Sequence, residues 1–301
     1  MPASILYGAP MPGLVQIPAG ATQVSPLVPG AAPLESIPDA SLDAAVVAAP
    51  PGVLERDAVL AHALRALKPG GRLTALAPKD KGGARLRKTL EGFGCHVEDL
   101  PKRRHRICHV VRPADLVGLE AAVAAGAPRF LEALGLWSWP GVFSWDRIDP
   151  GSLLLMQHLP PAFAGKGADL GAGIGVLAHH VLASRAVTAL TLLDVDRRAV
   201  EAARRNVVDP RAAFAWADVR KAALADLDFV VMNPPFHDAG SEDRNLGVGF
   251  ISAAAAALRR GGACWLVANK HLPYEAPLKA AFSRVELRAE AGGYKVYEAH
   301  R

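Results

Sequence analysis

The sequence predicts an α/β protein whose two halves are copies of one doubly wound parallel sheet. Short apolar runs alternate with alanine-rich amphipathic stretches, which is typical of a parallel sheet covered by helices. An apolar run that ends in two prolines, followed by a helix, a Gly-Gly turn and a strand, occurs twice in the sequence. Only its second occurrence is preceded by a glycine-rich turn. A length of 301 residues allows two domains of about 150 residues each. We therefore expect two tandem domains, the second of which carries the chemistry.

The elements of the two copies follow the same order along the chain. Residues 1–41 are expected to form proline-broken coil or short strands. The run 42–51 ends in V-V-A-A-P-P and leads through a helix and a Gly-Gly turn to another strand. The run 227–235 ends in V-V-M-N-P-P and leads to the same succession. Each copy closes with a predicted β-hairpin, at 95–111 and at 284–300. Such a repeat indicates duplicated half-folds.

The copies differ at the positions that carry chemistry. Where the second copy has Asn233, the first has Ala49, and the glycine-rich strand-to-helix turn precedes the second copy only. The first domain, residues 1–127, is therefore predicted to be degenerate. The second domain, residues 128–301, is predicted to be catalytic.

Composition narrows the class of protein. Hydrophobic residues make up 51% of the chain and charged residues 21%, as in ordinary globular domains, which argues against disorder. The apolar stretch 246–258 is shorter than the ~20 residues that a bilayer span requires. No secretion signal is readable in the proline-broken leader, and three isolated cysteines suit a reducing compartment. We expect a soluble, cytoplasmic, monomeric protein with no membrane partner and no metal.

The glycine-rich turn has the pattern D-x-G-x-G-x-G between a predicted strand and an amphipathic helix. Such glycines let the backbone approach a ligand at the positive end of the helix, although an ordinary tight turn uses the same residues. Asp194 ends the next strand about 20–25 residues later, where an acid can bind ribose hydroxyls. Asp218 is placed either to bind an adenine amino group or to cap a helix. The glycine spacing differs from the dinucleotide pattern G-x-G-x-x-G and indicates S-adenosylmethionine rather than NAD. The residues of the turn are Asp169, Gly171, Gly173 and Gly175.

The segment N-P-P-F-H-D begins directly after the apolar run that ends at Met232. Its two prolines forbid a helix or a central strand, so Asn233 is held at the carboxyl end of a strand, where open α/β sheets bind ligands. An exocyclic amine is a poor nucleophile because its lone pair is shared with the π-system. Acceptors on a carboxamide and on the proline backbone favour a pyramidal amine in the transition state of methyl transfer, and an aromatic ring can stack on a base. The predicted catalytic residues are Asn233, Pro234, Pro235 and Phe236.

With these motifs the chain resembles the RsmC/RlmG type of ribosomal RNA guanine-N2 methyltransferases, within the class I S-adenosylmethionine-dependent superfamily. The resemblance rests also on the segments W-P-G-V-F-S at 139–144, D-P-G-S-L-L-L at 149–155, A-N-K-H-L-P-Y at 268–274 and G-Y-K-V-Y at 293–297. It implies two Rossmann-like methyltransferase domains, the catalytic one with a seven-stranded-type sheet and an antiparallel last strand. It also implies that the cofactor lies over Asp169, Gly171, Gly173, Asp194 and Asp218, and that Phe143, Asp149 and Ser152 close over its methionine end.

A basic block lies in the first domain. The chain carries a net charge of +5, and residues 79–112 alone carry ten Lys and Arg against four acids. A solvated charged face has the same composition, but a neighbouring domain suited to nucleobase amines favours RNA phosphates as partners. The predicted RNA-binding residues are Lys79, Lys81, Arg85, Lys102, Arg103, Arg104 and Arg106.

The leading hypothesis is an enzyme that transfers a methyl group from S-adenosylmethionine to the N2 amine of a guanine in ribosomal RNA, with the small subunit favoured. Adenine N6 or a protein glutamine amide is the alternative acceptor. An RNA-binding ribosome assembly factor with little turnover is the alternative of another class. The target base must be accessible or extruded from its stack, so the expected partner is ribosomal RNA in a loop or a partly assembled subunit.

Overall fold

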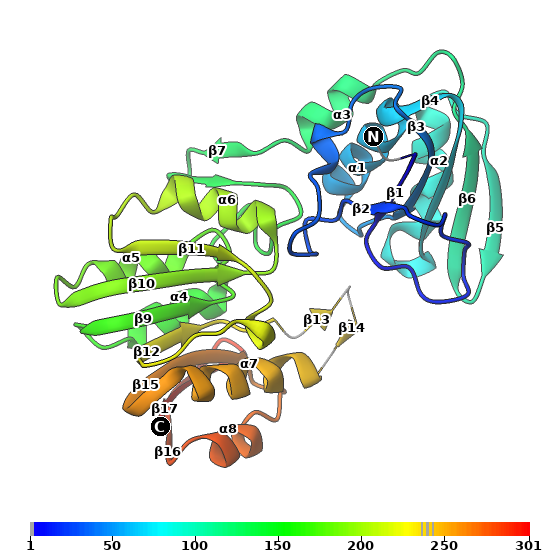
Figure 1. Ribbon diagram of the computed structural model, residues 1–301. Helices are drawn as coiled ribbons and strands as arrows, with labels where there is room; N and C mark the ends of the chain where they lie inside the picture. Colours follow the sequence, from blue (N-terminus) through cyan, green and yellow to red (C-terminus); the bar gives the residue numbers. More distant parts are fainter. Residues whose placement is uncertain (1–2, 236, 239–240, 243) are drawn as a thin grey trace. The chain divides into compact units, whose positions relative to one another are not determined.

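The computed structural model describes residues 3–235, 237–238, 241–242 and 244–301, coloured along the chain in Figure 1. The chain divides into two compact units, each described by itself. Unit 1 comprises residues 1–128 and 139–141, and unit 2 comprises residues 129–138 and 142–301. Phe236 lies outside the described residues.

Unit 1 contains a six-stranded sheet in the order β2-β1-β3-β4-β6-β5. Its strands are β1 (Ser4–Tyr7), β2 (Thr22–Gln23), β3 (Leu42–Ala48), β4 (Leu67–Pro78), β5 (Glu98–Lys102) and β6 (His105–Val111). Its helices are η1 (Leu34–Ser36), α1 (Val53–Ala66), η2 (Lys79–Gly83), α2 (Ala84–Gly92) and α3 (Leu119–Ala125). The leader thus forms two short strands among turns.

Unit 2 contains a seven-stranded sheet in the order β11-β10-β9-β12-β15-β17-β16. Its strands are β9 (Gly165–Leu170), β10 (Val187–Asp194), β11 (Ala212–Trp216), β12 (Leu227–Met232), β15 (Leu258–Asn269), β16 (Arg284–Ala291) and β17 (Tyr294–His300). Its helices are α4 (Pro150–His158), α5 (Val176–Leu182), α6 (Arg197–Asn206), η3 (Val219–Lys221), α7 (Arg244–Ala257) and α8 (Glu275–Ala281). Two small hairpins pair β7 (Arg129–Leu131) with β8 (Leu136–Ser138) and β13 (His237–Asp238) with β14 (Ser241–Glu242).

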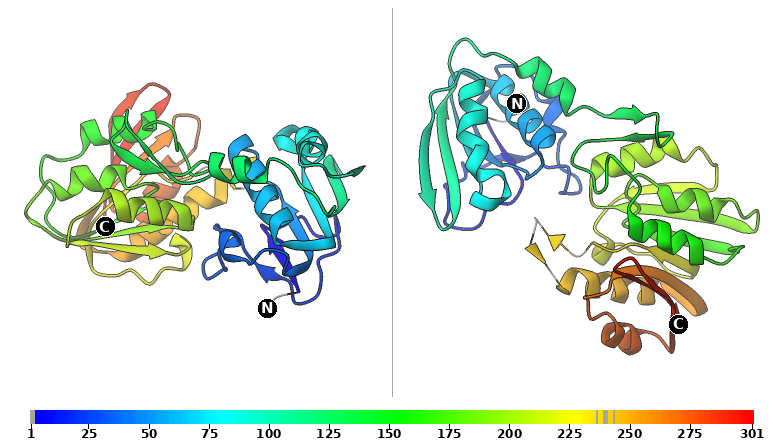
Figure 2. Two further views of the ribbon diagram at one scale, coloured as in Figure 1. Left: turned by 90° about the horizontal axis from the view of Figure 1, so that it is seen from above. Right: turned by 180° about the vertical axis from the view of Figure 1, so that it is seen from behind.

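Helices cover both faces of the unit 2 sheet (Figure 2). One core cluster joins the sheet to α4, α5 and α6, and a second joins it to α7 and α8. Strands buried on both faces are near-continuously apolar, as the sequence of β12, L-D-F-V-V-M, illustrates. In the described part of the chain, no helix has the length and apolarity needed to cross a bilayer.

The two sheets confirm the predicted repeat. β1, β3 and β4 pair in parallel as β9, β12 and β15 do, and in both units the final hairpin runs antiparallel. The register even shifts at equivalent places, between Leu42 and Ala44 in unit 1 and between Leu227 and Phe229 in unit 2. The sheet order of unit 1 lacks a counterpart of β11. The predicted hairpins are observed as β5–β6 and β16–β17.

Candidate functional site

The register of the two central strands of unit 2 brings two motifs together. β9 pairs in parallel with β12, and Leu170 lies opposite Met232. The glycine turn therefore begins at Gly171 directly beside Asn233, at the carboxyl edge of the sheet. On the other side of β9 the chain continues to β10, so this edge is the point where the strand order reverses. Open α/β sheets bind their ligands at such points.

A pocket opens at this edge, and its empty space, together with the solvent at its mouth, amounts to about 450 Å³. Its walls come from the loop before α4, the first turn of α4, the glycine turn with the start of α5, and the end of β12. The lining residues are Phe143, Ser144, Arg147, Asp149, Ser152, Gly171, Ala172, Gly173, Ile174, Val176, Leu177 and Asn233.

The three glycines of the turn have different surroundings. All three adopt positive φ, at 74° for Gly171, 54° for Gly173 and 88° for Gly175. A Cβ on Gly173 would meet no atom within 4 Å, so this position faces the open pocket. A Cβ on Gly175 would lie 2.9 Å from Val207 Cγ2, so Gly175 permits close packing against α6 and lies outside the pocket lining.

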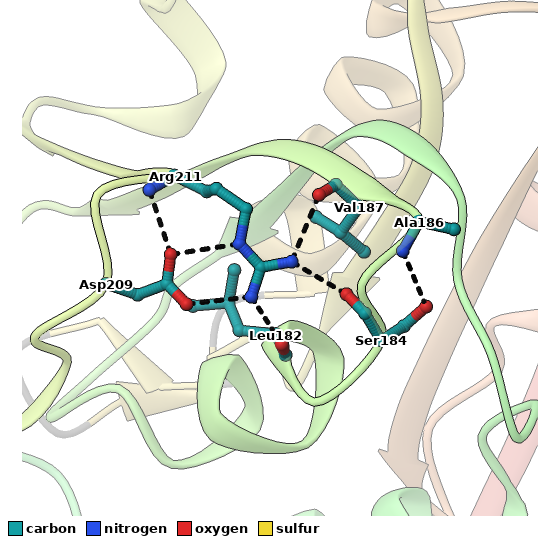
Figure 3. A network of polar contacts seen from close by, with 6 residues as sticks. All are labelled: Leu182, Ser184, Ala186, Val187, Asp209 and Arg211. Atoms are coloured by element: carbon teal, nitrogen blue, oxygen red, sulfur yellow. Dashed lines mark hydrogen bonds and ion pairs between the residues drawn. The ribbon is translucent and has the colours of Figure 1, made fainter.

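Arg211 anchors the far end of the helix that follows the turn (Figure 3). Its guanidinium donates to the carbonyl oxygens of Leu182 at 2.6 Å, Ser184 at 2.7 Å and Val187 at 3.1 Å. Asp209 accepts from the same guanidinium in a two-oxygen ion pair. The last carbonyl of α5 and two carbonyls that follow it thus gain donors, which fixes the C-terminal end of the helix whose N-terminus carries the glycine turn.

Two carboxylates lie at the ends of β9 and β10. Asp194 accepts hydrogen bonds from the backbone N–H of Gly173 and Asp196, both at 2.8 Å, and so stabilises the turn. Asp169 is completely buried, and neither of its carboxylate oxygens has a hydrogen-bond partner among the described residues. Burial, followed by the charge of Asp194, raises the pKa of Asp169 to about 8, and burial raises the pKa of Asp194 to about 6. A buried carboxyl group with a strongly raised pKa, such as that of Asp169, is typical of ligand sites.

The carboxamide of Asn233 is held by the first turn of α4. Its Nδ2 donates to Asp149 Oδ2 and to Ser152 Oγ, both at 2.9 Å. Asp149 is also the N-cap of α4, accepting from the backbone N–H of Ser152 at 2.9 Å, with Pro150 as the first helical residue. The structure therefore brings together Phe143, Asp149, Ser152, Gly171, Gly173 and Asn233 in one pocket.

Other predicted site residues lie elsewhere. Asp169, Asp194 and Asp218 are absent from the pocket lining. Asp218 caps η3 and forms an ion pair with Arg220. Pro234 is buried and Pro235 is exposed directly after Asn233. Ser144, the last residue of the segment at 139–144, and Arg147, between that segment and the one at 149–155, also line the pocket, although no role was predicted for either. Ser144 adopts a φ of 52°, a conformation that non-glycine residues rarely hold outside functional loops.

In unit 1, the carboxyl edge of the sheet that corresponds to the pocket edge of unit 2 lacks both the glycine turn and the asparagine. Ala49 and two prolines follow β3, and no carboxamide is present there. The completely buried Arg56 donates to the carbonyl of Pro51 at 3.3 Å and forms an ion pair with Asp57. Its guanidinium lies only 2.7 Å from where a Cβ of Gly82 would stand. A side chain of unit 1 itself fills this edge.

Tertiary structure joins the two parts of the basic block. The backbone N–H of Lys79 donates to the carbonyl of Arg104 at 2.9 Å, so the start of η2 lies against the turn between β5 and β6. Arg103 and Arg104 form that turn, are exposed and both have positive φ, at 45° and 62°. Lys102 instead donates to the carbonyls of Gly13 and Leu14 at 2.8 Å, and Arg106 pairs with Asp99. Lys81 and Arg85 belong to η2 and α2.

Within the described residues, no group of three or more His, Cys, Asp or Glu side chains is arranged to hold a metal ion. The three cysteines are buried and unpaired, as expected from their isolation in the sequence.

Comparison with known proteins identifies related chains. A family model described as methyltransferase small domain matches residues 133–298. Ribosomal RNA small subunit methyltransferase C of Pseudomonas entomophila is 33% identical over 273 residues, covering 88% of this chain and 81% of that protein. Its counterpart in Pseudomonas paraeruginosa is 35% identical over 272 residues, with the same coverage of both chains. Among solved structures, the Thermus thermophilus RsmC, a 16S rRNA guanine-N2 methyltransferase in complex with AdoMet and guanosine, matches with a TM-score of 0.74 and 28% identity. That match covers 89% of this chain and 75% of the other.

Proposed function

The chain belongs to the methyltransferase small domain family and, within it, to the ribosomal RNA small subunit methyltransferase C proteins, and from this premise we propose its reaction. The protein transfers a methyl group from S-adenosylmethionine to the exocyclic N2 amine of a guanine in the RNA of the small ribosomal subunit. The observation that carries the proposal is the position of the Asn233 carboxamide in the same pocket wall as the glycine turn.

The residues around the pocket fit S-adenosylmethionine. Gly173 leaves its side of the pocket open, and the buried carboxylate of Asp169 has no donor among the described residues. Asp194 keeps acceptor capacity for ribose hydroxyls, because each carboxylate oxygen can accept more than one hydrogen bond. Phe143, whose side chain is 62% exposed at the pocket wall, and the first turn of α4 would cover the methionine end. When bound, the cofactor supplies an electrophilic methyl group.

Asn233 prepares the amine for transfer. Its amide oxygen accepts a hydrogen bond from the target amine, and the rigid proline backbone adds carbonyl acceptors but no N–H at positions 234 and 235. Preorganised acceptors stabilise the positive charge that develops on the nitrogen. The N–C bond would form as the bond between the methyl carbon and the sulfonium sulfur breaks, and the methylated nitrogen would then lose one proton to solvent, so no strong general base is needed in the transfer itself.

Unit 1 supplies affinity for the RNA backbone. Lys79, Arg103 and Arg104 meet at the turn between β5 and β6, and phosphate contacts from such side chains orient a substrate without reading its sequence. The substrate is a loop or a partly assembled subunit in which the guanine is accessible. We propose that the protein acts as a cytoplasmic monomer.

Mass spectrometry of ribosomal RNA nucleosides tests the proposed function. Cells that lack the protein are expected to lose N2-methylguanosine from one small-subunit position, and the wild-type gene is expected to restore it. The Asn233→Ala gene serves as the control that separates turnover from mere RNA binding. An unchanged nucleoside profile, or tritium from labelled cofactor found in N6-methyladenine or in protein, would contradict the proposal.

A further inference from the structure

We propose that Asp149 and Ser152 are positioning residues that lock the Asn233 carboxamide with its oxygen facing the target amine, and thereby determine which acceptor chemistry the enzyme methylates. The inference rests on the proposed function for the role of the amide, but it concerns the two side chains behind that amide. Nothing in the family resemblance assigns them this role, since it places them at the methionine end of the cofactor.

The hydrogen-bonding capacity of the partners fixes which atom of the amide faces them. Asp149 Oδ2 acts as an acceptor, since the backbone N–H of Ser152 donates to it, and the amide atom 2.9 Å from the same oxygen is the nitrogen of Asn233. Ser152 Oγ, also at 2.9 Å, accepts the second hydrogen of the same nitrogen. Both N–H groups of Asn233 are therefore used inside the protein.

The remaining atom of the amide is an acceptor. Asn233 Oδ1 has no donor among the described residues, and the residue lines the pocket. A flip of the amide would place Oδ1 against the carboxylate of Asp149 and lose that hydrogen bond, whereas the Ser152 hydroxyl could still donate to Oδ1. The site consequently offers an acceptor to an amino group and would repel a carbonyl oxygen placed at the same point.

One helix turn holds both positioning residues rigidly. Asp149 accepts from the backbone N–H of Ser152 as it caps α4, so a single carboxylate oxygen binds both the helix start and the amide. The ring of Tyr294 packs against this turn, at 2.8 Å from where a Cβ of Gly151 would stand. A first turn that is constrained in this way can hold the Asn233 amide within a fraction of an ångström of the position that methyl transfer requires.

Two substitutions separate positioning from helix stability. Ser152→Ala removes one acceptor of the amide. Asp149→Ser retains a good N-cap but is too short to reach Asn233. We expect each to lower kcat about tenfold, since a hydrogen bond of this kind contributes about 1.4 kcal/mol. The dissociation constant of S-adenosylmethionine should change less for Ser152→Ala than kcat does, and Ser152→Thr, which keeps the hydroxyl, should recover most of the loss.

A double-mutant cycle tests whether Ser152 affects methylation through Asn233. In an Asn233→Ala background, Ser152→Ala should lower single-turnover methylation no more than about twofold, because its partner is already missing. The control is Ser283→Ala, which removes a serine hydroxyl bonded to the carbonyl of His300, away from the pocket, and should leave activity unchanged. Equal losses in the two backgrounds, or wild-type kcat in both single variants, would overturn the inference.

Nuclear magnetic resonance of the Asn233 side chain gives a readout independent of turnover. The two Nδ2 protons, assigned by their loss in Asn233→Ala, should exchange slowly with solvent in the wild type and faster in Ser152→Ala. Fast exchange in the wild type would overturn the lock even if guanine is methylated. Slow exchange in a protein that methylates no guanine would instead contradict the proposed function and leave the lock standing.

Discussion

At the scale of single residues, the site depends on polar groups whose partners the protein supplies only in part. Asn233 has its nitrogen satisfied and its oxygen open, and Asp169 has neither oxygen satisfied among the described residues. Buried polar groups without partners destabilise a fold and are found where a ligand completes the hydrogen bonding. Substitutions of Asn233 and of Asp169 test these two roles.

Asn233→Ala should lower methyl transfer more than tenfold, a barrier increase above ~1.4 kcal/mol, because the amine loses its acceptor in the transition state. The measurement is kcat with labelled cofactor and isolated small-subunit RNA. Cofactor affinity, measured by calorimetry, serves as the control for folding. Activity within tenfold of wild type would disprove the role of the amide.

Asp169 should make the stability of the cofactor-free protein depend on pH. Its pKa in the fold is raised from 3.8 to about 8, so the proton stabilises the folded state. This contribution is complete below about pH 4 and is lost as the pH rises towards 8. Asp169→Asn has no carboxyl proton to lose, so its stability should not fall in this way. The unfolding free energy of the variant relative to that of the wild type should therefore rise across this pH range, by an amount on the order of a few kcal/mol, as the size of the pKa shift implies. Urea unfolding at several pH values measures it, and a constant difference would contradict the expectation.

At the scale of elements, turns and helix ends determine the positions of the pocket residues and of the basic residues proposed to bind RNA. The hairpin β5–β6 closes through two residues with positive φ, the geometry of a type I′ turn that usually requires Asn-Gly. Here Arg103 and Arg104 occupy it, and left-handed conformations cost side-chain-bearing residues roughly 1–2 kcal/mol each. A turn that retains two strained arginines beside Lys79 is consistent with selection for charge rather than for stability.

Replacing the turn by Arg103→Asn with Arg104→Gly should therefore raise the melting temperature and weaken RNA binding. The salt dependence of RNA affinity should flatten by about one unit of slope for each phosphate that the variant no longer neutralises. Cofactor binding should stay unchanged. Lys102 is left intact because its ammonium binds the leader carbonyls. An unaltered salt slope would assign these arginines to a solvated face.

Substitution of Arg211, which anchors α5, is expected to lower both the melting temperature and the cofactor affinity. Arg211→Lys keeps the charge but loses the planar fork that reaches three carbonyls and Asp209 (Figure 3). The melting temperature should fall by several degrees, and cofactor affinity should fall with it because the glycine turn is carried by the same helix. Thermal scans with and without S-adenosylmethionine measure both. A stable variant with weak cofactor binding would show that the anchor acts on the turn alone.

At the scale of the whole molecule, the chain contains two copies of one half-fold, and we propose that the ligand site belongs to unit 2 alone. Apart from β11, the two sheets share their strand order, and they also share a register irregularity, yet the edge of unit 1 is filled by Arg56 and has Ala49 at the position of the amide. Different roles of the two units would explain this difference: unit 2 carries the methyltransferase site, and unit 1 is proposed to bind the RNA.

The duplication predicts a stoichiometry of one cofactor per chain. Calorimetric titration with S-adenosylmethionine should give a single site, and Gly173→Val should abolish it because a side chain there fills the open pocket. Ala49→Asn should add no second site, since unit 1 lacks the glycine turn. Two sites in the wild type would contradict the interpretation of unit 1 as degenerate.

The sequence by itself determined the local features of this protein. The strand-turn-helix order, both hairpins and the duplicated half-fold followed from periodicity, Gly-Gly turns and prolines, because these act between residues close in the chain. The repeat could be recognised since each half preserves its pattern of apolar runs and turns.

Only the tertiary structure decided which side chains meet. The register of β9 against β12 placed Gly171 beside Asn233, and the packing of α4 brought Asp149 and Ser152 behind the amide. It also faced Gly175 towards α6 and drew Lys102 to the leader. These contacts join residues up to 89 positions apart. No local pattern encodes such distances, because they arise from how buried sheet faces pack against their helices.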